Sequence, residues 1–279
     1  MSQQRPLGLV GAGSAAGSFL ARLPEFRKRL GPVKSISLRV ASRLANTLGA
    51  GFPVGRFEEL DECDAIFIIV PDSRARSTIR ELTASRIRLD GKSIILGDTW
   101  LGSEVLESAA LRGAGTGSVC LLEFSADIRF LIEGARHAVT EVKRILRHDA
   151  RSLTVAPESK PLVQAALTLS ESLLFPLLGA ADECLRYAGI PHLQAGAFLE
   201  AAAIRASRAY GKSGRKAWTG PLADGDTHLM KRQASALTQY DPTLLRFFLD
   251  QCQRALQYYG REVKWLSNSA EGEISKICL

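Results

Sequence analysis

Hydrophobic and polar positions alternate in two different ways along the 279 residues of this chain. In the first half, short apolar runs alternate with helical patterns. The runs that predict strands are 7–10, 35–40, 65–70, 93–96, 118–122 and 152–155. The stretches that predict helices between them are 15–29, 41–48, 75–82 and 104–111. Alternation of this kind indicates a parallel sheet covered by helices on both faces.

After about residue 156 the strand pattern ends and only helical spacing continues. The predicted helices are 161–174, 181–188, 193–210, 227–237 and 243–259. Prolines near the starts of these stretches favour helix beginnings there. We therefore predict an α/β protein, with a Rossmann-type parallel-sheet domain at residues 1–155 and an all-α domain at residues 156–279.

A glycine-rich turn follows the first apolar run and precedes a helical pattern. Its residues are Gly11, Ala12, Gly13, Ser14, Ala15, Ala16 and Gly17. In a dinucleotide-binding fingerprint, the first glycine permits the tight turn and the second lets the backbone approach a pyrophosphate. A small third residue, here Ala16, lets the helix pack on the strand. We predict that Gly11 to Ala16 bind a dinucleotide; the alternative is a glycine turn that holds no ligand.

The segment 26–57 contains no acidic residue but several basic ones. An NAD site normally places an acid near the end of the second strand, where it accepts a hydrogen bond from the ribose 2′-hydroxyl. Here that neighbourhood holds Ser37, Arg39, Ser42 and Arg43, which suit a 2′-phosphate. We therefore predict NADP rather than NAD as cofactor, the alternative being a solvated basic face.

Two further groups of polar residues follow predicted strands. The run 65–70 is apolar throughout, as a central parallel strand should be, and it leads into Val70, Pro71, Asp72 and Ser73. Ligands bind at the carboxyl ends of strands in open α/β sheets, so we predict cofactor contacts at these four residues. Asp98 and Thr99 follow the next strand, where they are expected to bind the nicotinamide carboxamide or the substrate.

Composition excludes several classes of function. The net charge of +7 would suit a polyanion, but the basic residues are spread along the chain and no aromatic residues interleave with them. An anionic cofactor accounts for the charge, and we expect no nucleic-acid partner. The five cysteines lie far apart and the four histidines lack ligand spacing. This pattern indicates reduced thiols in a cytoplasmic protein without a metal site.

No targeting or membrane segment is expected. The first strand begins after only six residues, which leaves no room for a signal peptide. The stretch 161–181 has Glu171 as its only charged residue, but Gln164, Pro176 and several hydroxyls interrupt it. A buried helix of a soluble domain fits this stretch better than a membrane span.

Lys160, Gln164 and Glu171 are spaced by four and seven residues, which places them on one face of a helix. Hydride transfer requires that the protein orient the acceptor and supply a proton. Lys160, its pKa lowered by burial, is predicted to donate the proton, and Gln164 to hold the substrate. The alternative is that Lys160 faces solvent and Glu171 pairs with a basic residue. Asp226 is expected to cap the helix that begins at Thr227.

Four motifs resemble those of a known group of proteins. They are Gly11-Ala12-Gly13, Val70-Pro71-Asp72-Ser73, Ile132-Glu133-Gly134 and the segment from Trp218 to Asp226. The chain resembles, over nearly its whole length, short two-domain proteins with a Rossmann-like N-terminal half and a helical C-terminal domain of unknown function. These proteins are related to ketopantoate reductase, pyrroline-5-carboxylate reductase and coenzyme F420-dependent NADP reductase.

The resemblance implies an NAD(P)-dependent oxidoreductase that is a dimer, with its active site in the cleft between domains. The helical domain would then serve substrate binding and dimerisation. Several cleft positions depart from the pattern of the group. Leu96, Cys120 and Gln164 stand where the group has histidines, and Asp224 stands where it has an arginine. The predicted function is hydride transfer from NADPH to a small carbonyl or imine substrate. The alternatives are a nucleotide-binding regulatory or scaffolding protein without turnover, and a non-redox enzyme on the same fold.

Overall fold

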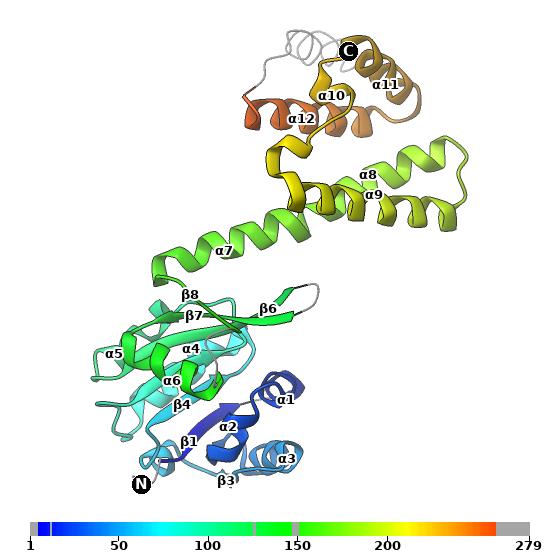
Figure 1. The fold of residues 1–279 in the computed structure, drawn as a ribbon. Helices are drawn as coiled ribbons and strands as arrows, with labels where there is room; N and C mark the ends of the chain where they lie inside the picture. Colours follow the sequence, from blue (N-terminus) through cyan, green and yellow to red (C-terminus); the bar gives the residue numbers. More distant parts are fainter. Residues whose placement is uncertain (1–4, 12, 125–126, 147–150, 261–279) are drawn as a thin grey trace. The chain divides into compact units, whose positions relative to one another are not determined.

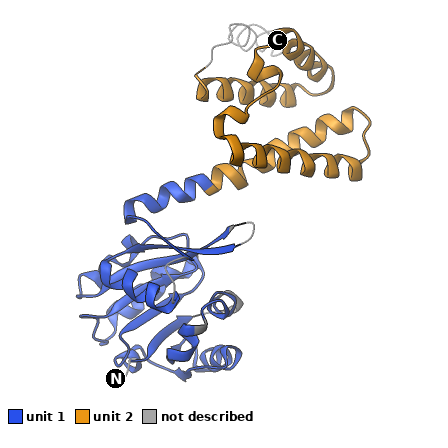
Figure 2. Ribbon diagram, viewed as in Figure 1, with its two compact units in different colours: residues 1–166 blue, residues 167–279 orange. Residues whose placement is uncertain are grey.

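The computed structural model describes residues 5–11, 13–124, 127–146 and 151–260, with backbone alone for residues 13–15, 24 and 124. The chain divides into two compact units, Met1–Ala166 and Leu167–Leu279 (Figure 2). We describe each unit by itself. The division falls inside a helix, further along the chain than the boundary expected at residue 155.

The first unit contains an eight-stranded sheet in the order β3-β2-β1-β4-β5-β6-β7-β8 (Figure 1). The strands are β1 Leu7–Gly11, β2 Leu30–Lys34, β3 Phe52–Val54, β4 Ala65–Ile69, β5 Ser93–Gly97, β6 Gly115–Phe124, β7 Asp127–Gly134 and β8 Ser152–Thr154. Neighbouring strands are parallel except for the antiparallel pair β6 and β7. The strand order reverses between β1 and β4, and such a switch point is where open α/β sheets bind ligands.

Helices cover both faces of this sheet. They are α1 Gly13–Ala21, α2 Pro24–Arg29, α3 Leu38–Leu48, α4 Asp72–Ala84, α5 Glu107–Ala110 and α6 Arg136–Leu146. Helix α7 Lys160–Leu167 follows β8, and only its first residue is buried. On β4, Phe67 packs into one hydrophobic cluster, with Phe19 and Leu44, while Ile66 and Ile68 pack into a second cluster on the other face. Strands buried on both faces explain why the run 65–70 lacks polar residues. The predicted parallel α/β sheet is confirmed.

The second strand differs from the prediction. It was expected at 35–40, but β2 occupies Leu30–Lys34 and α3 begins at Leu38. The Ser37 side chain accepts a hydrogen bond from the Val40 amide at 3.3 Å and so caps α3. Gly31 and Pro32 resemble turn residues, yet Pro32 lies within β2, next to an irregularity in its pairing with β1. Proline has no amide hydrogen to donate to a neighbouring strand, and the irregularity accommodates it because the regular hydrogen-bond pattern is interrupted there.

In the first unit, strands β3 and β7 and helix α6 were not predicted from the sequence. Strand β3 has only three residues and contains Pro53, so its apolar pattern is too short to stand out. Strand β7 carries Asp127, Arg129 and Glu133, which interrupt its alternation. Its pairing with β6 over eight residue pairs supplies the stability that local pattern does not indicate.

The second unit is helical throughout its described residues. After a π-helical turn at Thr168–Ser172, the helices are α8 Leu174–Tyr187, α9 His192–Ser213, α10 Pro221–Asp224, α11 Thr227–Tyr240 and α12 Pro242–Tyr258. Buried residues such as Met230, Leu245 and Leu249 form a core between α11 and α12. The predicted cap is confirmed, because the Asp226 carboxylate accepts a hydrogen bond from the Leu229 amide at 3.0 Å.

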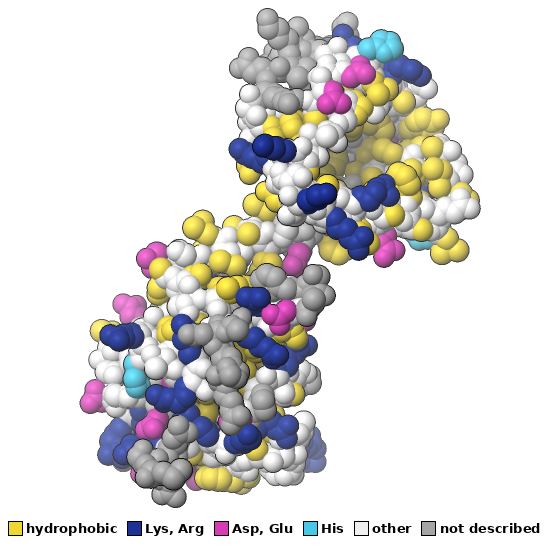
Figure 3. Space-filling model, viewed as in Figure 1, with side chains coloured by type: hydrophobic (Ala, Val, Ile, Leu, Met, Phe, Trp, Pro, Cys, Tyr) yellow, Lys and Arg dark blue, Asp and Glu magenta, His cyan; other side chains and the backbone are white. Residues whose placement is uncertain are grey.

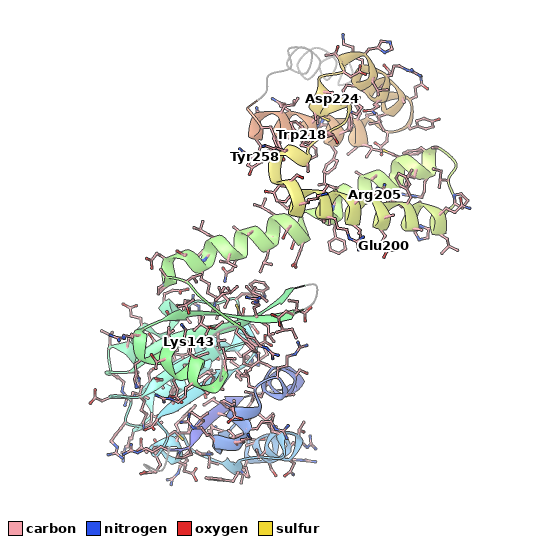
Figure 4. The ribbon with its side chains drawn as sticks, viewed as in Figure 1. Lys143, Glu200, Arg205, Trp218, Asp224 and Tyr258 are labelled. Atoms are coloured by element: carbon pink, nitrogen blue, oxygen red, sulfur yellow. The ribbon has the colours of Figure 1, made fainter. Side chains whose placement is uncertain are left out.

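The segment from Trp218 to Asp226 connects α9 to α11. The Trp218 ring stacks on Tyr259 with centroids 4.1 Å apart, and the Arg215 guanidinium lies 4.6 Å from the Tyr258 ring centre. Figure 4 shows Trp218 and Tyr258 close together near the end of α12. Gly220 has φ 103°, a conformation that favours glycine. This motif therefore builds the turn that brings α11 onto α12.

The expectation of a buried helix at 161–181 is wrong, because no residue of this stretch is buried by the rest of the described chain. The helical stretch Pro157–Tyr187 is long and apolar enough to cross a membrane, by length and composition alone. Leu162, Leu169 and Phe175 are 72%, 67% and 74% exposed. The sequence pattern alone did not reveal this exposure, since apolar positions that face a partner look the same as positions that face a core.

Candidate functional site

The carboxyl ends of three adjacent parallel strands, β1, β4 and β5, meet at one edge of the sheet. Gly11 pairs with Ile69 and Ile68 pairs with Leu96, so the three strands end at nearly the same level. The residues that follow them are the glycine-rich turn, then Val70 to Ser73, then Asp98 and Thr99. The fold therefore brings together three groups of predicted site residues that lie far apart in the sequence.

The glycine-rich turn lies between β1 and α1, at the place in the fold where its residues predicted it. Helix α1 begins at Gly13, directly after β1, and Ala16 is fully buried against the sheet. A Cβ atom at Gly11 would lie 2.9 Å from the end of the Leu44 side chain, so a larger residue there would require Leu44 of α3 to move. Ala12 lies outside the described residues, as do the side chains of Ser14 and Ala15. The first turn of α1 contains no acid, which leaves its amide groups suited to a phosphate.

The expected 2′-phosphate region lies on α3 rather than on a strand. The buried Ser35 hydroxyl donates to the Gly11 carbonyl at 2.6 Å and ties the end of β2 to β1. Arg39 and Arg43 are exposed and one helical turn apart, and neither guanidinium pairs with another described residue. Ser42 is partly buried beside them. These free cations, in a helix whose first turn lacks acids, fit a phosphate.

Asp72 joins the start of α4 to the loop after β5. Its Oδ1 accepts from the Thr99 hydroxyl at 2.5 Å, and its Oδ2 accepts from the Trp100 amide at 3.3 Å. The Thr99 oxygen in turn accepts from the Leu101 amide at 3.0 Å. Val70 is half-buried, while Pro71 and Ser73 are exposed beside this junction. The Asp72 carboxylate thus fixes the loop that follows β5.

Helix α7 holds the same loop from the other side. The Lys160 ammonium donates to the Thr99 carbonyl at 3.2 Å, to the Leu101 carbonyl, and to the Ser118 hydroxyl at 2.6 Å. The Gln164 side-chain amide donates to the Trp100 carbonyl between them. Three consecutive carbonyls are therefore bound by α7. We name Thr99, Trp100 and Leu101 the clamped loop.

Lys160 is only 1% exposed, so the alternative that it faces solvent is wrong. Burial lowers the pKa of its ammonium, as the sequence led us to expect, while nearby groups including Cys120 and Glu133 oppose the shift. All three ammonium protons have an acceptor. Proton donation by Lys160 stays a prediction, and the observed contacts favour a positioning role for this residue.

A buried network that the sequence did not reveal supports Lys160. Glu133 is 1% exposed, and its Oε1 accepts from the Ser103 amide at 2.8 Å and from the Ser118 hydroxyl. Its Oε2 accepts from the Ser103 hydroxyl at 2.6 Å. The Ser118 hydroxyl therefore links the Lys160 ammonium to the Glu133 carboxylate. The signal in the sequence was an acid directly after an apolar run, in the Ile132-Glu133-Gly134 motif.

Glu171 is not brought to this group. Helix α7 ends at Leu167, and Glu171 lies in the π-helical turn of the second unit, where it is exposed. The π-helical turn interrupts the α-helical spacing from which a common face with Lys160 and Gln164 was inferred. Its alternative role is not supported either, because Glu171 forms no ion pair with any described residue.

Asp98 is the only residue besides glycine with a positive φ in the described part of the chain, at 51°. Its amide donates to the Val119 carbonyl at 2.9 Å, which keeps it at the end of β5. Although the residue is exposed as a whole, partial burial of its carboxyl raises the pKa, and the negative charge of Asp72 raises it further. Asp98 thus holds its proton more tightly than an ordinary aspartate.

The raised pKa of Asp98 predicts a pH-dependent effect on stability. The folded state binds this proton above the ordinary pKa of 3.8, so the contribution of Asp98 to stability falls as pH rises through its folded pKa. Asp98→Asn removes the charge and tolerates the left-handed backbone. We expect a gain of at most about 1 kcal/mol near pH 7, after solvent screening, that shrinks toward pH 4. Urea unfolding at both pH values measures it, and identical gains at the two would contradict the assignment.

These features define a class of fold. An open parallel sheet with a glycine-rich turn at its switch point, followed by an all-α unit, is the fold of Rossmann-like oxidoreductases with a helical C-terminal domain. Residues 128–254, just under half of the chain, match the family model described as "Domain of unknown function (DUF2520)". This match and the fold confirm the resemblance to the short Rossmann-like group. No curated protein shows a significant match.

Solved structures share this fold over most of the chain. A candidate NADP oxidoreductase from Bacteroides fragilis is 16% identical with a TM-score of 0.70, covering 90% of this chain and 97% of its own. A reductive aminase from Aspergillus terreus in complex with NADPH and ethyl levulinate is 15% identical with a TM-score of 0.64, covering 96% and 100%. An imine reductase from Myxococcus stipitatus in complex with NADP+ is 16% identical with a TM-score of 0.63, covering 91% and 94%. At these identities the likeness shows a common fold.

Proposed function

We propose that this protein is an NADP(H)-dependent oxidoreductase that transfers hydride to a small carbonyl or imine compound. The observation that carries the proposal is the meeting of the glycine-rich turn, Asp72 and Asp98 at the carboxyl ends of β1, β4 and β5. This is the edge, at the switch point of the sheet, where Rossmann-type proteins bind dinucleotides.

The described residues fit a dinucleotide with a 2′-phosphate. The amide groups at the start of α1 would hold the pyrophosphate, and Arg39 and Arg43 on α3 would hold the 2′-phosphate. Both arginines lack a partner among the described residues, which leaves their guanidinium groups available. Two of the structural neighbours are described as complexes with NADPH or NADP+, which supports the same cofactor here.

The cofactor, when bound, supplies the hydride. The protein must then orient the acceptor and deliver a proton to its oxygen or nitrogen. Asp98 is exposed at the sheet edge and its pKa is raised, so we assign it the proton transfer. The Thr99 hydroxyl donates its hydrogen bond to Asp72, and the Lys160 ammonium donates to three oxygens. These two residues and Gln164 therefore position the clamped loop.

A titration with NADPH and NADH, followed by nicotinamide fluorescence, tests the cofactor assignment. Ketones and preformed imines are then added, and loss of nicotinamide absorbance reports turnover. We expect NADPH to bind and to be oxidised by at least one acceptor. Absence of NADPH binding would contradict the cofactor assignment, and binding without oxidation across a broad panel would contradict the enzyme assignment.

A second candidate function is nucleotide binding without turnover, in a regulatory or scaffolding role. The complete occupation of the Lys160 protons favours it, because it removes one expected proton donor from the site. Turnover by the wild-type protein separates the two functions, and one variant then tests the assigned proton donor. Asp98→Asn should abolish most oxidation of NADPH in an enzyme while leaving NADPH affinity nearly unchanged.

Removing the two arginines of α3 should change cofactor preference. For the Arg39→Ala/Arg43→Ala double variant, we expect NADPH affinity to fall by at least about tenfold, since charge-assisted hydrogen bonds to phosphate are lost. NADH affinity should change little, because NADH lacks the 2′-phosphate. The Lys231→Ala/Arg232→Ala variant removes two exposed cations from α11, outside the interface proposed below, and controls for net charge. Equal losses for both cofactors would refute the selectivity argument.

We further propose that the protein is a homodimer whose interface includes α8 and α9. Across both helices only Ala195 is buried, while Phe175, Leu193 and Phe198 are 74%, 87% and 55% exposed. A hollow of about 350 Å³ lies among α8, α9 and α12, and Gln251 is its only polar lining residue. Figure 3 shows hydrophobic side chains gathered in this part of the second unit. Apolar faces of this extent require a partner, and a second copy presents the same faces.

The remaining expectations concern location and partners. The four described cysteines are free thiols, which supports a cytoplasmic protein; Cys278 lies outside the described residues. We propose a small-molecule substrate and no nucleic-acid partner. Lys160, near the start of the long apolar helical stretch, is hydrogen-bonded to the sheet unit, which favours a protein partner over a membrane for that stretch.

A further inference from the structure

Trp100 has a large exposed apolar side chain on a fixed backbone. The residue is 56% exposed although its two neighbours are anchored in the sheet unit. Thr99 is buried and Leu101 is half-buried. An exposed tryptophan forgoes the stabilisation that burial of its large apolar surface would give. An indole held in solvent at a ligand-binding edge therefore calls for an explanation.

The backbone around Trp100 is held from both directions. Its amide donates to Asp72 at 3.3 Å, and its carbonyl accepts from Gln164. The carbonyls on either side of it both accept from Lys160. This anchoring removes the freedom that an exposed loop would otherwise have. A binding group whose backbone is fixed loses little entropy when a ligand arrives, which is how recognition sites are preorganised.

The charges next to Trp100 are acidic. Asp98 and Asp72 both lie at this edge, and the charge of Asp72 raises the pKa of Asp98. Of the cations near them, Lys160 is buried with its protons bound. Arg22 lies close enough to act on Asp98, and its guanidinium is 3.9 Å from Glu123. A substrate carboxylate placed here would meet the like charge of Asp72, and among the described residues it would find no bidentate partner except Arg22.

We infer that Trp100 is a specificity-determining residue whose indole contacts an apolar or aromatic group of the substrate. The substrate class is a ketone, or the imine formed from it, that carries such a group and bears no carboxylate beside the reacting carbon. This inference rests on the proposed function. It goes beyond that function by choosing among carbonyl compounds, and it separates this chain from enzymes that reduce keto acids.

Three related compounds test the inference by turnover. Acetone and phenylacetone differ by an aromatic ring, and phenylpyruvate differs from phenylacetone by a carboxylate in place of a methyl group. We expect phenylacetone, alone or with methylamine, to be the preferred substrate. Trp100→Ala should raise its KM by about five- to tenfold, the effect of losing an aromatic contact, with little change for acetone. Trp100→Phe should restore most of the difference.

A second measurement needs no turnover. The Trp218→Phe/Trp265→Phe variant leaves Trp100 as the only tryptophan of the chain. We expect phenylacetone to quench its emission at concentrations where acetone and phenylpyruvate do not, with and without NADPH. NADPH affinity should be the same in the Trp100→Ala variant as in the wild type, which shows that this variant is folded.

The failures of the two proposals are distinguishable. If NADPH binds but Trp100→Ala leaves the phenylacetone KM unchanged, and phenylacetone quenches Trp100 no better than acetone or phenylpyruvate does, the inference is overturned and the proposed function stands. A preference for phenylpyruvate would also overturn it. If NADPH does not bind, the proposed function fails, and quenching of Trp100 by phenylacetone alone still decides whether the indole is a binding surface.

Discussion

Lys160→Met is expected to destabilise the protein by about 2–4 kcal/mol and to remove most of its turnover. Methionine has a similar length but donates no hydrogen bond. The carbonyls of Thr99 and Leu101 would lose their common donor, and Glu133 would remain a buried carboxylate without the cation that its Ser118 link provides. The clamped loop would then be free to move, and small displacements of a positioning group cost much of the rate.

The free energy of urea unfolding measures this change, and the same substitution at an exposed lysine controls for it. Lys28 pairs with Glu25 on the surface at 2.7 Å, so Lys28→Met should cost less than about 1 kcal/mol. Adding Glu133→Gln to Lys160→Met should recover part of the loss, because it removes the uncompensated charge. A Lys160→Met protein as stable as the wild type would show that the network contributes nothing.

The pH dependence of this variant follows from the lowered pKa of Lys160. Its folded pKa lies below the ordinary value of 10.5, so the unfolded state binds the proton more tightly. The free energy of unfolding of the wild type should therefore increase as pH rises from the folded-state pKa of Lys160 to its ordinary pKa, and Lys160→Met should lack this increase. The comparison of unfolding free energies at neutral and alkaline pH checks the sign.

Phe198→Glu is expected to convert the dimer into a folded monomer. Phe198 lines the apolar hollow and is 55% exposed in a single chain, so the monomer tolerates the charge while the interface would have to bury it. Burial of an unpaired carboxylate costs several kcal/mol, and a symmetric interface meets that cost twice. Light scattering should give a mass of twice 30.2 kDa for the wild type and 30.2 kDa for the variant.

Leu111→Glu is the matched control for the dimer prediction. Leu111 is 82% exposed, more than Phe198, but it belongs to the sheet unit and not to α8 or α9. The control should leave the mass of the dimer unchanged. Circular dichroism must show that the helices of the Phe198→Glu protein persist. A wild-type protein that is monomeric at micromolar concentration would refute the proposed interface.

The elements that sequence predicted well are those whose pattern is local. The continuous apolar run at β4, the glycine-rich turn before α1 and the Asp226 cap of α11 each follow from residues a few positions apart. Strand β2 was misplaced because Gly31 and Pro32 resemble a turn. Their place in the sheet depends on β1 and β3, which lie outside any local window.

The site shows the same division. Sequence indicated Asp72, Asp98, Thr99, Lys160 and Gln164 as residues with chemistry to perform, because polar groups at strand ends and helix starts are candidates for ligand contact. It did not reveal Trp100 or the Glu133 network. The sequence does not show that a tryptophan is exposed or that a glutamate is buried, because both depend on residues far away in the chain.

By itself, the sequence determined the α/β class, the glycine-rich turn and the preference for an anionic cofactor, since each depends on the spacing or charge of neighbouring residues. Only the tertiary structure decided what Lys160 does. Its acceptors on the clamped loop lie 59 and 61 residues earlier, and they reach it because β5, β6 and α7 meet at one edge. A buried ammonium group is stable only when its protons are hydrogen-bonded, and here carbonyl and hydroxyl oxygens accept those bonds.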